Sequence, residues 1–209
     1  MAANLEAGHM DGFCAGEPWS RRAIHGGAGA LVAPSSQVWP DHPGKALGAR
    51  ADFAAAHPNA CRAMVAALLD TARWLDASPV NSEAAAEVLS SAAYVNTGVE
   101  VLRTCLLPRR ADFPALRFFG DGAATFPWLS DGMWFLTQQR RWGLLAGDPD
   151  YRAVAARVNH VDLYREAAQL AGVAVPEEAM RSSTLIDGRV WNGSDPAAYA
   201  RSFAIHDLR

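Results

Sequence analysis

One lysine stands out as the residue best suited to hold a small charged ligand. Lys45 is the only lysine among 19 basic residues, and it follows Pro43-Gly44 at the start of a predicted strand. Its ammonium group offers three hydrogen-bond donors and a positive charge without an acceptor, which suits a small oxyanion. From the residue type alone, a lysine that faces solvent is a simpler interpretation than an anion-binding lysine.

A charged and an aromatic residue share a shaped turn earlier in the chain. An apolar run from Asp11 ends in Gly16-Glu17-Pro18-Trp19, where glycine supplies backbone freedom and proline fixes φ at about −65°. The pattern predicts a strand that leads into a turn, and side chains at the end of a strand often line a cleft. Glu17, Pro18 and Trp19 are therefore candidate cleft-wall residues, although an ordinary strand-to-helix connection explains them equally well.

The sequence lacks the usual residue patterns for catalysis and metal binding. It has no Gly-x-Ser-x-Gly nucleophile motif, no His-Glu-x-x-His zinc motif, no Walker loop and no dinucleotide fingerprint. Gly26–Gly29 lacks the Gly-Lys-Ser/Thr ending of a phosphate loop, and Asp41-His42 with His57 or His160 lacks a recurring metal-ligand spacing. We expect no catalytic residue, no metal site, no cofactor and no enzymatic activity.

Composition and charge limit the classes of partner. The 209 residues carry a formal net charge of −3, which gives no electrostatic reason to bind nucleic acid or an anionic membrane. No apolar run approaches the roughly 20 residues that span a bilayer, so no transmembrane segment is predicted. The first residues lack the basic and apolar regions of a secretion signal, so the chain as given is expected in the cytoplasm.

The three cysteines do not form a recognisable motif. Cys14, Cys61 and Cys105 lie far apart without metal-ligand spacing, and their odd number leaves at least one thiol free. Cysteine is a small residue that is often buried, so all three are interpreted as buried hydrophobic residues.

Hydrophobic periodicity predicts a chain dominated by helices. The clearest helix runs from Pro58 to about Ala77, where apolar residues recur at the i, i+3, i+4 spacing of an amphipathic core helix. Strands are predicted at Met10–Ala15, Ala30–Ala33 and Lys45–Arg50, and a hairpin turn is predicted at Asp187-Gly188. Further helices are expected at 20–24, 52–56, after Asn81 or Ser82, at 99–106, after Ser130, at 148–158, at 163–170 and after Asp195.

One region is irregular and rich in aromatic residues. Residues 108–128 combine Arg109-Arg110 with five aromatic side chains, which predicts a long loop packed by its own aromatics. Paired arginines beside aromatics also occur in nucleic-acid-binding segments, but the negative net charge disfavours that interpretation.

Five stretches of the sequence resemble one known family, in the same order along the chain. They are similar to the nitrate-, cyanate- and bicarbonate-binding branch of the solute receptors of ABC transporters, which has cytosolic nitrate sensors as relatives. The stretches are Asp11–Trp19 (DGFCAGEPW), Trp39–Gly48 (WPDHPGKALG), Trp134–Gly143 (WFLTQQRRWG), Val158–Ala167 (VNHVDLYREA) and Phe203–Ile205. The resemblance implies that the chain corresponds to the C-terminal half of the family unit.

The resemblance also implies a fold. The expected class is α/β, of the periplasmic-binding-protein-like type II, incomplete and mostly helical. Residues 1–33 would form the end of the second lobe and the hinge. Residues 34–209 would form the C-terminal part of the first lobe, with the long aromatic loop near 108–128. A lobe without its N-terminal strands would leave sheet edges and apolar faces uncovered.

For function, the resemblance implies the solute-binding component of an ABC-type nitrate or nitrite uptake system, here a fragment without its N-terminal half. Its partners would be nitrate or nitrite and an ABC permease, and the intact receptor would be periplasmic or membrane-associated. The alternative is a cytosolic nitrate/nitrite sensor that controls a regulatory partner protein. An enzyme of thiamine-pyrimidine biosynthesis on the same fold would need a cysteine cluster and a pyridoxal-binding lysine and histidine, and neither is evident.

The resemblance changes the interpretation of Lys45. In the nitrate receptors a lysine in the same Asp-His-Pro-x-Lys context contacts the bound anion. The next residue here, Ala46, is apolar and leaves no second charge, which favours nitrate or nitrite over bicarbonate. Most other anion contacts of the family lie in the half that this chain does not match.

Overall fold

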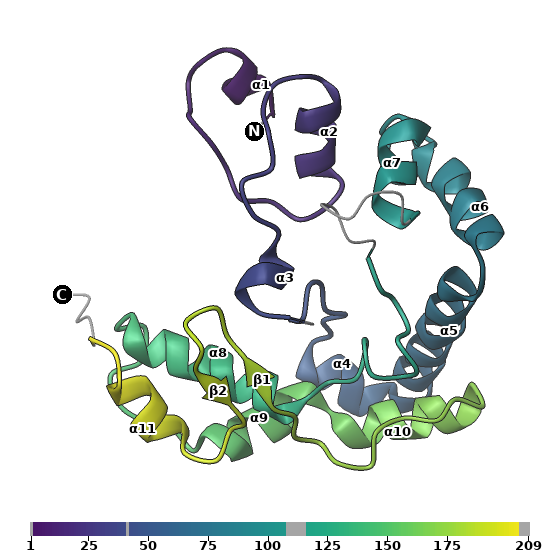
Figure 1. The fold of residues 1–209 in the computed structure, drawn as a ribbon. Helices are drawn as coiled ribbons and strands as arrows, with labels where there is room; N and C mark the ends of the chain where they lie inside the picture. Colours follow the sequence, from purple (N-terminus) through teal and green to yellow (C-terminus); the bar gives the residue numbers. More distant parts are fainter. Residues whose placement is uncertain (1, 41, 108–115, 205–209) are drawn as a thin grey trace. The chain divides into compact units, whose positions relative to one another are not determined.

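The chain folds into two compact units (Figure 1), and the computed structural model describes residues 2–40, 42–107 and 116–204. The first unit combines Met1–Pro34 with Thr71–Gly120, and the second combines Ser35–Asp70 with Asp121–Arg209. Helices dominate both units, as the periodicity predicts. The expected assignment of residues 1–33 and 34–209 to two lobes stays a prediction.

The first unit is a small helical assembly. Helix α6 (Pro79–Ser90) packs on α7 (Val99–Leu106), and α2 (Trp19–His25) contacts both α7 and α1 (Ala2–Glu6). The side chains buried in this unit are small or aliphatic, as expected for closely packed short helices. One hydrophobic cluster of this unit consists of Ala85, Ala86, Leu102, Cys105 and Leu106.

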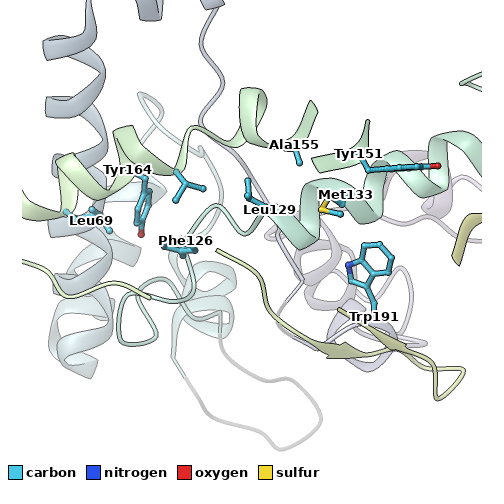
Figure 2. Close-up of a cluster of buried hydrophobic side chains, with 10 residues drawn as sticks. Leu69, Phe126, Leu129, Met133, Tyr151, Ala155, Tyr164 and Trp191 are labelled. Atoms are coloured by element: carbon cyan, nitrogen blue, oxygen red, sulfur yellow. The ribbon is translucent and has the colours of Figure 1, made fainter. Parts of the chain in front are cut away.

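The second unit holds the larger core and more aromatic residues. Its helices are α3 (Ser35–Val38), α4 (Ala51–Ala56), α8 (Leu129–Arg141), α9 (Tyr151–Asn159), α10 (Val161–Leu170) and α11 (Pro196–Arg201), together with the part of α5 (Pro58–Ala77) up to Asp70. Helix α8 packs against both α9 and α11. Figure 2 shows the buried cluster, which consists of Leu69, Phe126, Leu129, Met133, Tyr151, Ala155, Val161, Tyr164, Ala168 and Trp191.

The prediction of a helix from Pro58 to Ala77 is confirmed in its bounds by α5 (Pro58–Ala77). Its core face is only partly as expected. Leu69 and Ala72 are buried, whereas Met64 and Leu68 are about half exposed, at 48% and 51%. The apolar face of α5 is therefore wider than the part of this helix that packs against other described residues.

Helix starts follow local capping chemistry. Helix α6 begins at Pro79, because proline is well suited to the first helical position. Ser78 is its N-cap, and the Ser78 side chain accepts a hydrogen bond from the backbone N–H of Asn81. The predicted start at Asn81 or Ser82 is therefore wrong. Asp150 and Asp195 cap α9 and α11 in the same way, as expected.

Only one strand pair forms within the described part of the chain. Strands β1 (Ser183–Thr184) and β2 (Val190–Trp191) pair antiparallel around the predicted Asp187-Gly188 turn, where Gly188 has φ of 77°. The predicted strands at Met10–Ala15, Ala30–Ala33 and Lys45–Arg50 are not formed. A strand exists only as part of a ladder, and these segments have no ladder partner among the described residues.

The aromatic region after α7 is partly described. Residues 108–115 lie outside the described residues, so that part of the predicted loop is not assessed. The carboxylate of Asp76 accepts hydrogen bonds from the backbone N–H groups of Phe118, Phe119 and Gly120 at 3.1, 2.7 and 3.3 Å. Phe126 is buried in the core of the second unit.

None of the described helices is both long and apolar enough to span a bilayer.

Candidate functional site

The Glu17-Pro18-Trp19 corner is a compact turn that leads into α2. The backbone N–H of Trp19 bonds to the carbonyl of Gly16 at 3.2 Å, and the Ser20 hydroxyl bonds to the carbonyl of Ala15 at 3.1 Å. Pro18 is buried, whereas Trp19 is 44% exposed. The corner thus presents the tryptophan outward and keeps the proline inside.

Glu17 is held by an arginine one helical turn later. Its carboxylate accepts hydrogen bonds from Nε of Arg21 at 3.1 Å and from the backbone N–H of Arg21 at 3.3 Å. The same guanidinium donates to the carbonyl of Thr104 on α7 at 2.6 Å. Glu17 and Arg21 therefore join the corner, α2 and α7, a structural function that the sequence did not reveal. Whether Glu17 also lines an anion site stays a prediction.

A buried thiol lies beside this ion pair. The Cys105 sulfur lies 3.8 Å from Oε2 of Glu17, and burial, followed by the negative charge of Glu17, raises the pKa of the thiol to about 11. Cys61 and Cys105 are buried, as expected. Cys14 is exposed, which contradicts its expected burial, because the predicted strand that contains it is not paired.

Trp19 lines a cavity of the first unit. This cavity has a volume of about 1060 Å³ and is lined by residues of α1 and α2, by Ser90 at the end of α6, and by the stretch from Asn96 into the first turn of α7. Arg22 and His25 line it together with Glu6 and Glu100. Because the lining mixes carboxylates with basic side chains, the cavity alone does not select for an anion.

Lys45 lies in the second unit, shortly after a turn that is stabilised by hydrogen bonds of the His42 ring. The His42 ring contacts the carbonyl of Pro43 through Nδ1 at 2.8 Å and the hydroxyl of Ser35 through Nε2 at 2.6 Å. Trp39 is buried, and its ring lies 4.6 Å from that of Trp134 on α8. The turn from Ser35 to Pro43 is therefore anchored, and exposed Lys45 follows it in an irregular segment.

A buried ion pair braces the start of α8. Asp131 accepts two hydrogen bonds from Arg181, at 3.0 and 2.5 Å, and the guanidinium also lies 5.5 Å from the ring centre of Trp128. Burial raises the pKa of Asp131, and the positive charge of Arg181 opposes that rise. Ser130 accepts from the backbone N–H of Arg181 through Oγ and from the indole N–H of Trp191 through its carbonyl. Sequence reasoning missed this brace, because its two charges are separated by 50 residues of chain.

The structure brings together only part of the predicted anion site. Glu17, Pro18 and Trp19 lie together in the first unit, whereas Lys45 lies in the second. A site that joins them stays a prediction. Within the described ranges there is no group of three or more His, Cys, Asp or Glu side chains that could hold a metal ion.

Comparison with known proteins gives relatives along the whole chain. The model of the NMT1-like family matches residues 1–90. A nitrate/nitrite binding protein NrtA from Synechocystis is 32% identical over 231 residues, covering all of this chain and 50% of the relative. The bicarbonate transport ATP-binding protein CmpC from Synechocystis is 35% identical, with 99% of this chain and 32% of the relative covered.

A solved structure matches the fold. The crystal structure of the periplasmic nitrate-binding protein NrtA from Synechocystis PCC 6803 superposes with a TM-score of 0.88 at 30% sequence identity. The match covers 98% of this chain and 56% of that chain. The expected periplasmic-binding-protein-like fold, incomplete and mostly helical, is thereby confirmed. The chain spans about half the length of the nitrate-binding relatives that it matches.

Proposed function

We propose that this chain, a relative of the nitrate- and bicarbonate-type solute-binding proteins, supplies half of a receptor for a small oxyanion in an ABC-type uptake system. The observation that carries the proposal is the superposition of nearly the whole chain on a nitrate-binding protein, with a TM-score of 0.88. Nitrate or nitrite is the proposed solute. The intact receptor is proposed to work on the periplasmic side with a permease.

The physical chemistry of a small anion favours a charged contact in a closing cleft. Such an anion has too little apolar surface to be held by the hydrophobic effect, so it needs charge-assisted hydrogen bonds away from bulk water. We assign the counter-charge to Lys45, which follows the anchored turn from Ser35 to Pro43. Removing one partner of a buried charge pair costs about 2–5 kcal/mol of binding free energy. We expect the loss of Lys45 to weaken anion binding by an amount in this range.

The Glu17-Pro18-Trp19 corner is proposed as the opposing wall. Pro18 fixes the turn and Trp19 offers an exposed ring, while Arg21 holds the Glu17 carboxylate in place. Closure by hinge rotation would bring the two lobes onto the anion and create the form that a permease reads. The division of the chain after Pro34 supports a lobe boundary there, whereas the grouping of Thr71–Gly120 with the first unit is not accounted for by this assignment.

The choice of anion rests on the residue beside the lysine. Ala46 is apolar, so no second charge is available at that position to hold a cation next to the anion. This supports nitrate or nitrite over bicarbonate, although relatives named for both solutes match the chain. Nothing in the described residues favours the alternative expectation, a cytosolic sensor.

The proposal is tested by calorimetric titration with nitrate. The chain alone is compared with a fusion in which the part of Synechocystis NrtA that this chain does not match precedes Met1. We expect little or no heat from the chain alone and saturable binding from the fusion, because the remaining anion contacts are expected in the unmatched part. Micromolar binding by the chain alone would contradict the half-receptor proposal, and a folded fusion that binds no small oxyanion would contradict the function.

A further inference from the structure

The His42 ring bridges two points of the chain just before Lys45. Its Nδ1 atom lies 2.8 Å from the carbonyl oxygen of Pro43, and its Nε2 atom lies 2.6 Å from the hydroxyl oxygen of Ser35. A carbonyl oxygen only accepts hydrogen bonds, so the proton of the neutral ring must be on Nδ1, and Nε2 then accepts from the Ser35 hydroxyl. Both ring nitrogens of His42 are therefore engaged within this chain, and the ring is held in one orientation.

The Ser35 end of this bridge is fixed to the core of the second unit. Trp39 is buried, its backbone N–H donates to the carbonyl of Ser35 at 3.0 Å, and its ring lies 4.6 Å from that of Trp134 on α8. The neighbouring carbonyl of Val38 accepts from the backbone N–H of Ile186 at 2.9 Å. Helix α3 is thus anchored by two independent contacts.

The other end of the bridge fixes the backbone two residues before the lysine. The pyrrolidine ring restricts φ of Pro43 to about −65°, and the hydrogen bond from His42 to its carbonyl restricts ψ, because ψ sets the direction of that carbonyl. Gly44 alone separates Pro43 from Lys45, and a Cβ atom on Gly44 would have no neighbour within 4 Å. Glycine is the most permissive residue and packing does not restrain it here, so without the His42 bond the chain could leave Pro43 in many directions.

We propose that His42 is a positioning residue for Lys45, and that its ring directs the lysine ammonium toward the anion without contacting the anion itself. This inference rests on the proposed function, in which Lys45 supplies the counter-charge. The benefit is pre-organisation, because a long, flexible side chain on a fixed backbone has less freedom to lose when the anion binds. A direct contact between His42 and the anion is not the proposed role, since both ring nitrogens already have partners in the chain.

Nitrate titration of the NrtA fusion described above tests this role. His42→Phe keeps an aromatic ring but removes both nitrogens, and we expect it to raise the Kd for nitrate by about five- to tenfold, the share of one ordered side chain. His57→Phe is the matched control, because His57 is an exposed histidine of the same unit whose ring lies beside that of Phe53. The control should leave the Kd within about twofold of the wild type.

Two amide substitutions separate the hydrogen bond from ring packing. The amide nitrogen of asparagine, like Nδ1 of histidine, is bonded to Cγ, so His42→Asn keeps a donor near the Pro43 carbonyl. The amide nitrogen of glutamine is one bond further out, so His42→Gln does not. We expect His42→Asn to stay within about threefold of the wild-type Kd and His42→Gln to weaken binding as much as His42→Phe does. The reverse order would overturn the proposal.

A double-mutant cycle with Lys45 distinguishes positioning from a structural role or a direct contact. If His42 acts only through the lysine, His42→Phe should change the Kd by less than about twofold in the Lys45→Gln background. An equal loss in both backgrounds, or no loss in either, would overturn the proposal. Should His42→Phe not fold, Ser35→Ala removes only the hydrogen bond at Nε2 and should give about a threefold loss that likewise requires Lys45, and its absence would overturn the proposal too.

The proposed function and the positioning role fail in different ways. A folded wild-type fusion that binds no small oxyanion contradicts the function and the inference with it, whereas equal Kd values for the wild type and His42→Phe contradict the inference alone. NMR of the His42 ring nitrogens in the chain alone adds a test without ligand. It should show the Nδ1–H tautomer, and the Nε2–H tautomer would overturn the bridge to Pro43.

Discussion

The Glu17 carboxylate is surrounded by groups that no local sequence pattern brings together. Arg21 is one helical turn away and could be anticipated from its i, i+4 spacing. Cys105 and Thr104 come from α7, more than 80 residues later, and their contacts depend on tertiary packing. The sequence thus predicted the turn at Glu17-Pro18-Trp19, but it did not predict which residues of α7 contact Glu17 and Arg21.

Cys105 leads to a prediction about pH. Its pKa in the folded state, about 11, lies above the ordinary thiol value of 9.0, so the folded state holds the proton more tightly. Its contribution to stability is fully present below about pH 9 and is lost as pH rises through about 11. Between pH 8 and pH 10.5 the wild type should therefore lose on the order of 1–2 kcal/mol more than Cys105→Ala.

Urea unfolding at the two pH values measures this difference. Other titrating groups, including the tyrosines, are common to both proteins and cancel in the comparison. Parallel losses of stability in the wild type and in Cys105→Ala would show that the thiol does not titrate as its surroundings imply.

At the scale of elements, most helices and the hairpin around Asp187-Gly188 were predictable, whereas the three other predicted strands are not formed. Helix α5 and helix α7 match their predicted bounds, because amphipathic spacing and caps are local signals. Met10–Ala15 carries a sound strand pattern but forms no ladder, since a strand also needs a neighbour. The Asp131–Arg181 brace was missed for a related reason, because it joins α8 to a segment far along the chain.

The contact between α8 and α9 depends on a glycine. A Cβ atom on Gly132 would lie 3.0 Å from Oδ1 of Asn159 and 3.3 Å from Cβ of Ala155. Asn159 cannot easily move away, because its amide donates to the carbonyl of Trp128 at 2.8 Å. We expect Gly132→Ala to lower the free energy of unfolding by about 1–3 kcal/mol through overpacking.

Gly147→Ala is the matched control for this substitution. A Cβ atom there would have no neighbour within 4 Å, so the change should stay within about 0.5 kcal/mol of the wild type. Chemical denaturation of the three proteins side by side gives the comparison. Equal stability of Gly132→Ala and Gly147→Ala would mean that α8 and α9 are not as closely packed as described.

At the scale of the whole molecule, the family resemblance predicted from five sequence stretches is confirmed by matches that cover nearly all of this chain and about half of each nitrate-binding relative. The expected fold class is confirmed by the same superposition. The site itself could not be predicted to the same degree. Lys45 and the Glu17-Pro18-Trp19 corner lie on different units. The resemblance implies that most other anion contacts lie in polypeptide that this chain does not match, so a shared anion site stays a prediction.

The central claim is that one ammonium group provides the counter-charge for the anion, and substitution of Lys45 in the NrtA fusion tests it most directly. Arg50→Gln is the control, because Arg50 is an exposed cation five residues later that pairs with Asp52. By calorimetry, Lys45→Gln should raise the Kd for nitrate by about 30-fold or more, while Arg50→Gln leaves it within about twofold. Nitrate affinity that survives Lys45→Gln, or falls equally in both variants, would contradict the account.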